Sequence, residues 1–311
     1  MSNAAHRSTL RLMDLDTELT ALAAQEDLPA HLVQRLLRHP AARRMAALKR
    51  RDLTEEQIEQ IIALGSARSL AANRSVPATI KARLAEHPDS TVRCAAAATA
   101  TNEPPGLLGL LARLADDPEP LVRSFLAMNE HLPAELGARL AADPDPGVRE
   151  SAAEYCRNVP DMVRRALFAD PEPGVRQRAV VRWSPPLEML PALLADPATR
   201  VATARHAPPS RELASDPDPS VRIAVAAHPE LPTDLRDLLA EDSNPPVRSE
   251  IAFRPDTPPA LREQLEATLT TEDPAEAFHL SFRRHTCPSP APAPSPPPHE
   301  QAEALLTQAG L

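Results

Sequence analysis

The sequence predicts an all-α solenoid of about ten short two-helix repeats, on three observations. A phrase containing Val-Arg recurs along the chain, mostly at intervals of 26 or 27 residues. Apolar residues keep fixed, helical distances from that phrase. Aromatic residues make up only 2% of the chain, whereas alanine-rich stretches such as CAAAATA (94–100) allow helices to approach closely. A period of roughly 20–50 residues is typical of a stack of similar units.

A landmark valine defines the repeat. It falls at Val92, Val122, Val148, Val175, Val201, Val221 and Val247, with intervals of 30, 26, 27, 26, 20 and 26 residues. A leucine stands eight residues before every landmark, from Leu84 to Leu239. An apolar residue stands twelve residues before all but one of them, where Pro209 takes its place. We therefore expect each repeat to bury its leucine and its valine.

Each repeat is predicted to be a pair of short helices. In the first helix, Leu235 and Leu239 are four residues apart and share one face. In the second helix, Asp218 is the expected N-cap, Pro219 occupies the first helical position and Val221 points inward. Helices of roughly 8–10 residues do not persist alone in water, so stacking must stabilise them.

Weaker copies extend the pattern toward the N-terminus, with landmarks near Ala67 and Arg43. The solenoid is expected over residues 17–267, after an N-terminal extension over 1–16. Residues 268–298 include CPSPAPAPSPPP and are expected to be a Pro-rich, disordered linker. Residues 299–311 are expected to form a short amphipathic segment that docks on the solenoid or on a partner, or else a disordered end. Its apolar residues, expected to be exposed, are Leu305, Leu306 and Leu311.

The phrase DPDPSVRIAVAAHPELPTDLRDLLAED (216–242) and its relatives resemble the leucine-rich repeat variant family, which is similar in style to HEAT-like repeats. The resemblance covers roughly residues 17–267 and implies a right-handed superhelix of alternating α and 3₁₀ helices. The founding type also carries an N-terminal cysteine cluster that holds an iron–sulfur centre. Here Cys94, Cys156 and Cys287 are far apart and form no C-x-x-C pair, so no cofactor is expected.

Composition limits the compartment and the partners. The net charge of −9 disfavours a nucleic-acid binder, because phosphate affinity requires a concentrated basic surface. Three cysteines cannot form a disulfide framework, and the first residues contain no apolar signal region. No apolar run approaches membrane-spanning length, so a cytoplasmic protein is expected. Arginine outnumbers lysine 32 to 2, which suggests a bacterial genome of high GC content.

The sequence contains no recognisable catalytic pattern. It has only seven glycines and shows no phosphate loop, no H-E-x-x-H and no nucleophile elbow, so no enzyme is predicted. Three histidines precede a proline at turns of the repeat and are interpreted as turn residues: His39, His87 and His228. His279, His285 and Cys287 are close in sequence but lack a fourth ligand, so no metal site is assigned to them.

One segment is strongly basic. Residues 31–51, HLVQRLLRHPAARRMAALKRR, carry seven positive charges and no acid. The simpler interpretation is a solvated face of the first repeats. The alternative is a site for an acidic partner, in which Arg43 and Arg44 take part.

One repeat breaks the pattern. In residues 196–219, Ala202 replaces the usual arginine, and Pro209 replaces an inward leucine. Arg205 and His206 stand where the next repeat has two apolar residues. The shortened step of 20 residues predicts a notch there. A decayed repeat that merely bends the superhelix is the simpler alternative, although such departures also mark functional sites.

If this irregular region binds a partner, Trp183 is the expected apolar anchor, because Trp and Arg are favoured at interfaces. Directional contacts to carboxylates or phosphates are assigned to Arg178, Arg182, Arg205 and Arg211.

A second set of arginines follows the landmark valines: Arg93, Arg123, Arg149, Arg176, Arg222 and Arg248. Each follows an aspartate, or its substitute His87, by a fixed step. The favoured interpretation is structural, because Asp and Arg from adjacent repeats could pair and satisfy backbone groups of the turn.

Two function classes remain. The first is a non-catalytic scaffold or adaptor whose elongated surface binds another, acidic protein. The second is a nucleic-acid-binding or DNA-repair protein, by similarity to alkylpurine DNA glycosylases, which are also built from HEAT-like repeats. Those proteins use a basic concave face with aromatic residues and a catalytic carboxylate. Here acidity dominates and one Trp is present, so a protein partner is favoured, while the oligomeric state is open.

Overall fold

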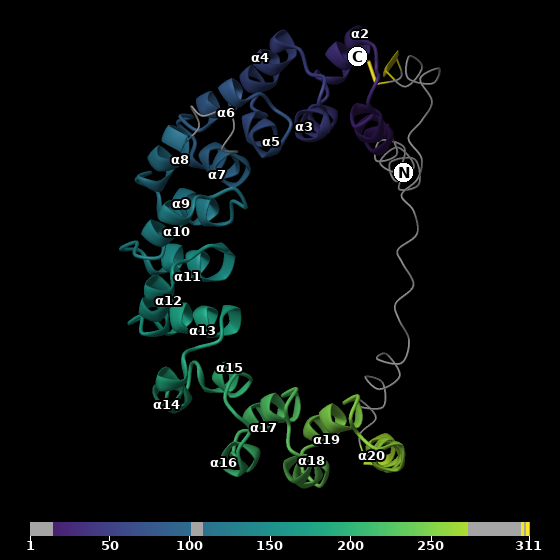
Figure 1. The fold of residues 1–311 in the computed structure, drawn as a ribbon. Helices are drawn as coiled ribbons and strands as arrows, with labels where there is room; N and C mark the ends of the chain where they lie inside the picture. Colours follow the sequence, from purple (N-terminus) through teal and green to yellow (C-terminus); the bar gives the residue numbers. More distant parts are fainter. Residues whose placement is uncertain (1–14, 101–107, 273–305, 308, 311) are drawn as a thin grey trace, which may run out of the picture. The chain divides into compact units, whose positions relative to one another are not determined.

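The computed structural model describes residues 15–100, 108–272, 306–307 and 309–310. Every regular element within these ranges is helical (Figure 1). The chain divides into two compact units, one formed by residues 1–160 with 292–311 and the other by residues 161–291. Within each unit the predicted all-α repeat solenoid is confirmed.

The first unit begins with a helix over residues 15–23. Five helix pairs follow it: α2 (Ala30–Leu36) with α3 (Pro40–Lys49), α4 (Glu55–Ala63) with α5 (Ala67–Ala72), α6 (Ala78–Leu84) with α7 (Ser90–Thr99), α8 (Leu108–Ala115) with α9 (Pro120–Ala127), and α10 (Ala134–Leu140) with α11 (Pro146–Tyr155).

The second unit contains four further pairs and a final helix. They are α12 (Asp161–Phe168) with α13 (Pro173–Arg182), α14 (Leu190–Ala195) with α15 (Arg200–Ala204), α16 (Arg211–Ala214) with α17 (Pro219–Ala226), α18 (Thr233–Ala240) with α19 (Pro245–Ala252), and α20 (Pro259–Glu272). A 3₁₀ turn, η2 (Leu187–Met189), leads into α14.

We call the even-numbered helices α2 to α18 first helices and the odd-numbered helices α3 to α19 second helices. Each first helix packs on the second helix of its own pair. The second helices also pack in series, from α3 to α11 in the first unit and from α13 to α19 in the second. Both members of most pairs are α-helical, so the alternation of α and 3₁₀ helices implied by the resemblance does not hold here.

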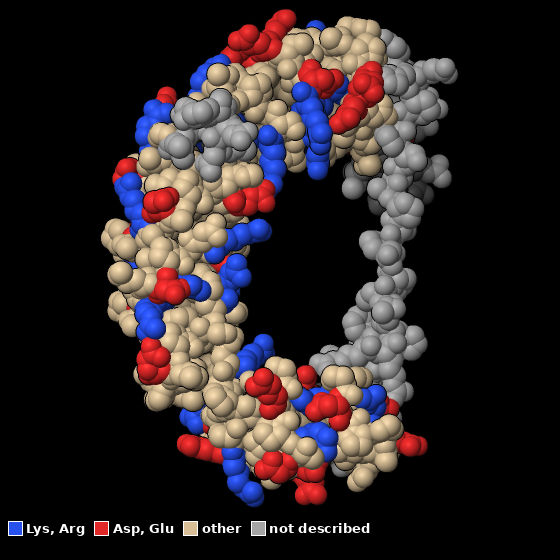
Figure 2. Space-filling model, viewed as in Figure 1, with Lys and Arg blue, Asp and Glu red and all other residues tan. Residues whose placement is uncertain are grey.

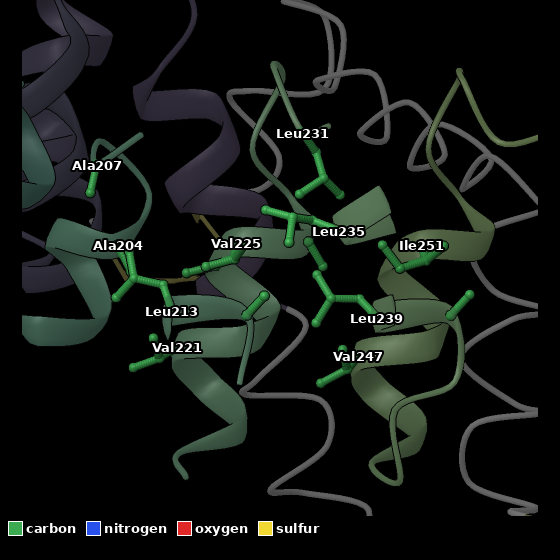
Figure 3. Close-up of a cluster of buried hydrophobic side chains, with 14 of the residues drawn as sticks. Ala204, Ala207, Leu213, Val221, Val225, Leu231, Leu235, Leu239, Val247 and Ile251 are labelled. Atoms are coloured by element: carbon green, nitrogen blue, oxygen red, sulfur yellow. The ribbon is translucent and has the colours of Figure 1, made fainter. Parts of the chain in front are cut away.

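The core lies between the first and second helices. The leucine eight residues before the landmark is buried in all seven copies, with Leu140 and Leu239 completely inaccessible. Six landmark valines are also buried, and Figure 3 shows how Val221 and Val247 lie beside the leucines of the second unit. The predicted inward positions are therefore confirmed, with Val201 as the exception.

Local capping explains where the second helices begin. Asp218 is the N-cap of α17 and accepts a hydrogen bond from the amide of Ser220 at 2.8 Å, and Pro219 follows at the first helical position. Asp145 caps α11 through the amides of Gly147 and Val148. A carboxylate at this place satisfies amides that lack an intrahelical acceptor, as the sequence predicted for Asp218.

The predicted register of the irregular repeat is wrong by two residues. Thr199, which is inaccessible to solvent, takes the place of the landmark valine, and Arg200 takes that of the arginine that follows it. Val201 is only half-buried, and Arg205 ends α15 instead of standing at an inward position. The turn DPATR is two residues shorter than DPEPGVR one repeat earlier. Val201 is therefore not the residue that corresponds to Val175. The arginine that Ala202 appeared to replace is thus present.

The ends of the solenoid differ from the expected boundaries. The first helix of the chain already includes residue 15, and α20 extends to Glu272, so residues 268–272 are helical. The remainder of the Pro-rich linker lies outside the described residues. In the C-terminal segment Leu306 is completely buried, contrary to the expected exposure, whereas Leu305 and Leu311 lie outside the description.

Candidate partner-binding surfaces

The recurring arginines form a structural latch between neighbouring repeats. Arg123 donates from Nε to Asp143 Oδ2 at 2.7 Å and from Nη2 to Asp143 Oδ1 at 2.8 Å. Its Nη1 donates to the carbonyl of Asp117 in its own turn at 2.7 Å. The same bidentate pairing joins Arg93 to Asp117 and Arg222 to Asp242. The predicted pairing of arginine with aspartate is confirmed for Arg93, Arg123, Arg176 and Arg222.

The latch aspartates also stabilise the turn that contains them. Asp143 Oδ1 accepts a hydrogen bond from the amide of Asp145 at 2.9 Å. Burial alone would raise the pKa of Asp143, but the hydrogen bonds from Arg123 and this amide, together with the arginine charge, hold its pKa below the usual value. The pKa of Asp117 and of Asp242 is lowered against burial in the same way. The latch therefore consists of ionised groups.

A second series of contacts joins the ends of the second helices. Asn129 Nδ2 donates to the carbonyls of Ala97 at 2.6 Å and Ala100 at 2.8 Å, at the end of the preceding second helix. Asn73 and Arg254 make the equivalent contacts one repeat back. The last carbonyls of a helix lack intrahelical donors, so these side chains satisfy them. Sequence reasoning missed this set, although a polar residue six or seven places after the landmark is visible in the sequence.

Exposed arginines on the first helices are paired with acids of a neighbouring repeat. Arg83 contacts Glu59 at 2.5 Å, Arg113 contacts Glu86 at 2.9 Å and Arg165 contacts Glu188 at 2.6 Å. Arg139 pairs with Asp116 in the same manner. The first-helix surface thus neutralises most of its own positive charge.

The end of α13 and the end of α15 carry exposed arginines that belong to second helices. Arg178 and Arg182 are exposed and four residues apart on α13, and Arg205 is exposed at the C-cap of α15, which packs against α13. Within the described residues neither Arg182 nor Arg205 forms an ion pair, and Val181, directly before Arg182, is 65% exposed. Figure 2 shows Lys and Arg side chains along this edge of the second helices. We call these four residues, Arg178, Val181, Arg182 and Arg205, the arginine face.

Trp183 lies directly after this face. It is the C-cap residue of α13, its side chain is half-buried, and its backbone amide donates to the carbonyl of Ala179 at 2.9 Å. The side chain borders a small cavity of about 180 Å³ together with Phe168, Arg164 and Pro186. Its position next to the arginine face is compatible with the predicted anchor, but part of its surface fills the repeat.

Arg211 is separated from the other predicted contacts. It starts α16, a first helix, whereas Arg178, Arg182 and Arg205 belong to second helices. Beside α16 lies an open cavity of about 670 Å³, which we call the notch. Its apolar lining comes mainly from Leu187, Leu190, Leu194, Pro208 and Leu213. The predicted notch is therefore present in the irregular repeat, but none of the five residues predicted to bind lines it.

The basic segment 31–51 is partly structural. Arg43 occupies the latch position of α3, where it donates to the carbonyl of Leu37 at 2.9 Å and to Ser66 Oγ at 3.0 Å. Arg50 is buried and contacts Asp52. Arg44 is exposed and has no ion pair among the described residues. Of the two arginines assigned to an acidic partner, Arg44 is the accessible one.

The histidines and cysteines take structural positions. The Nδ1 atoms of His87 and His228 each accept a hydrogen bond from a turn amide at 3.1 Å, and His39 caps α3, so the interpretation as turn residues is confirmed. Cys94 and Cys156 are buried, and burial raises the pKa of the Cys156 thiol to about 12. In the described ranges no three His, Cys, Asp or Glu residues are grouped to hold a metal ion, while His279, His285 and Cys287 lie outside those ranges.

The helices are also short or polar. Throughout the part of the chain that is described, none combines the length and the apolar character needed to cross a membrane.

Comparison with known proteins finds a structural likeness. No protein-family model matches the chain. No curated protein matches it either. Among solved structures, the chain is similar to one described as "a leucine-rich repeat variant with a novel repetitive protein structural motif", with 23% sequence identity and a TM-score of 0.45. The match covers 64% of this chain and 84% of that one. The resemblance that the repeat phrase suggested is thus also found by comparison of structures.

Proposed function

We propose that this protein is a non-catalytic scaffold that binds an acidic segment of another protein at the arginine face. The observation that carries the proposal is the contrast between the two helix surfaces. Arg83, Arg113 and Arg139 on first helices pair with acids of the neighbouring repeat, whereas Arg182 and Arg205 have no such pair in the described residues. Planar guanidinium groups that present free donors are well suited to carboxylates.

The apolar components of the surface favour a protein partner. Val181 directly precedes Arg182 and has most of its side chain exposed, and Trp183, directly after Arg182, is half-buried. An apolar centre with charged surroundings is typical of protein interfaces. The net charge of −9 opposes the approach of a long polyanion such as DNA to the protein as a whole.

The test compares two double variants that remove the same charge. Arg182→Gln with Arg205→Gln removes two of the three positive charges of the arginine face, and Arg113→Gln with Arg139→Gln removes two exposed arginines that already pair with acids. Binding of fluorescein-labelled poly-L-glutamate and of a labelled DNA duplex is measured by anisotropy over a range of salt concentrations. We expect poly-L-glutamate binding that weakens with salt and that the first variant loses selectively.

Equal losses in both variants would assign the binding to net charge alone and contradict the proposed site. Tighter binding of the duplex than of poly-L-glutamate, lost in the first variant, would favour the nucleic-acid alternative. Melting temperatures of both variants close to that of the wild type are the control for folding.

A further inference from the structure

The notch exists because the first helix of one repeat is too short. α16 has only four residues, Arg211–Ala214, whereas the neighbouring first helix α18 has eight. Pro208 and Pro209 precede the N-cap Ser210, and a residue followed by proline disfavours the helical conformation, so Ala207 and Pro208 do not extend the helix. The apolar residue that other repeats place twelve before the landmark is therefore missing. The cavity of about 670 Å³ occupies this part of the repeat.

The walls of the notch are unusually apolar for an open surface. Leu187 is 71% exposed at its edge, and Leu190, Leu194 and Leu213 line the interior. Exposed leucine at the edge of an apolar cavity is typical of an interaction site. The charged groups that line it are Glu212, Arg200 and Asp216, of which the last two pair with one another.

Arg200 distinguishes the notch from the regular repeats. Its guanidinium makes one side-chain hydrogen bond in the described residues, from Nη2 to Asp216. The equivalent Arg222 uses Nε, Nη1 and Nη2, because it also reaches the carbonyl of its own turn at 2.8 Å. In the shortened turn, Arg200 donates to no turn carbonyl among the described residues, and the hydroxyl of Thr199 donates to the carbonyl of Leu193 at 2.6 Å. Arg200 is 42% exposed and lines the notch, and its guanidinium has further N–H donors beyond the one that contacts Asp216.

We propose that the notch binds one apolar helical turn of a partner protein, with the C-terminal end of that turn facing Arg200. The last carbonyls of a helix are acceptors without intrahelical donors and carry partial negative charge, so they complement an arginine with free donors. This chain already uses the same contact, since Arg254 donates to the carbonyls of Ala226 at 2.8 Å and His228 at 2.7 Å. The leucines of the incoming turn replace the apolar residue that Pro209 removes.

The charges in the notch favour such a turn over a free anion. Asp216 already compensates Arg200, and Glu212 adds a negative charge at the edge, so a fully charged anionic ligand gains little. A helical turn presents only the partial charge of its carbonyls. None of the residues that line the notch belongs to the arginine face, so the inference is independent of that face.

The experiment uses the full-length protein and a defined probe. The probe is a synthetic peptide with blocked ends and the sequence of residues 232–242, PTDLRDLLAED, which contains the leucines of a regular first helix. We expect saturable binding by fluorescence anisotropy, and no binding of the same peptide when its three leucines are replaced by alanine. A nitroxide at the C-terminal end of the peptide should broaden the amide signals of Arg200 and Ala207, whereas one at the N-terminal end should not.

Three variants of the protein locate the site. Leu187→Glu should weaken peptide binding at least about tenfold, because it places a charge against the incoming leucines. Arg200→Lys keeps the positive charge beside Asp216 but removes the planar guanidinium group. It should weaken peptide binding less than Leu187→Glu does. Met162→Glu is the matched control, because Met162 is an 81% exposed apolar residue of the same unit that does not line the notch.

Binding that survives Leu187→Glu, or that falls equally in Met162→Glu, would overturn the proposal. Signal broadening by the N-terminal label alone would also overturn it, because the peptide would then bind in the reverse orientation. Saturable binding of a fatty acid in place of the peptide would overturn it as well. These outcomes do not depend on Arg182 or Arg205, so they are distinguishable from a failure of the arginine face.

Discussion

Removing one half of a latch should destabilise the protein far more than removing an exposed ion pair of the same repeats. In Arg123→Gln, Asp143 loses both guanidinium hydrogen bonds, at 2.7 and 2.8 Å, and keeps that from the amide of Asp145. The Asp143 side chain is only 7% exposed, so its carboxylate stays largely buried after the donors are lost. The carbonyl of Asp117 also loses its contact with Nη1.

The structure sets the expected size of the effect. Loss of one partner from a buried ion pair costs roughly 3–5 kcal/mol, because the remaining charge stays buried. Arg123 is 12% exposed, so we expect about 3 kcal/mol. The matched control is Arg139→Gln, whose pair with Asp116 has side chains 47% and 63% exposed. An exposed pair contributes about 0–1 kcal/mol.

The assay is urea denaturation followed by circular dichroism at 222 nm, a standard helix wavelength, for the wild type and both variants at neutral pH. Because the latch holds the pKa of Asp143 below its usual value, its stabilisation is fully present above the unfolded-state pKa of about 3.9. It is lost as pH falls through the lower, folded-state pKa. The difference in unfolding free energy between wild type and Arg123→Gln should therefore narrow in acid.

A cost for Arg123→Gln no larger than that for Arg139→Gln would refute the view that the latch is a buried, ionised pair. A difference that persists unchanged at acidic pH would show that the loss arises from side-chain packing and the carbonyl contact, and not from the carboxylate.

Three further predictions test the packing and the surface. Leu140→Ala should lower the unfolding free energy by roughly 2–5 kcal/mol, because Leu140 is completely buried, and an unchanged urea midpoint would place it outside the core. Cys156, whose pKa burial raises to about 12, should resist iodoacetamide in the native protein and react in urea, as peptide mass spectrometry can show. Trp183→Ala should weaken partner binding by about 2 kcal/mol while the melting temperature stays nearly constant. Loss of stability with binding retained would show that Trp183 only fills the repeat.

The irregular repeat shows where sequence reasoning reached its limit. Valine and arginine were assigned by counting along the chain, and that method cannot detect a turn that is two residues shorter. Only the packed structure identifies Thr199 and Arg200 as the equivalent residues, because burial and hydrogen bonding decide equivalence. The notch was predicted from the shortened step. The residues that line it were not predicted. The two prolines delay the start of α16, and which side chains of neighbouring helices then line the cavity depends on the packing between repeats.

The predicted contact residues were separated for the same reason. Residues near one another in sequence were grouped as one surface, but Arg211 starts a first helix, whereas Arg182 and Arg205 end second helices. Arg43 was assigned to a partner because of the charge of its segment, yet it occupies a latch position.

The sequence by itself determined the all-helical repeat, the buried leucine and valine positions, the Asp218 cap and the pairing of aspartate with arginine. These features depend on residues at short, fixed spacing, and the period of the chain repeats them. The tertiary structure alone decided which arginines are free, which carbonyls the asparagines satisfy and where a cavity opens. Those properties depend on how far neighbouring helices extend and which side chains meet across repeats, and a single repeat does not contain that information.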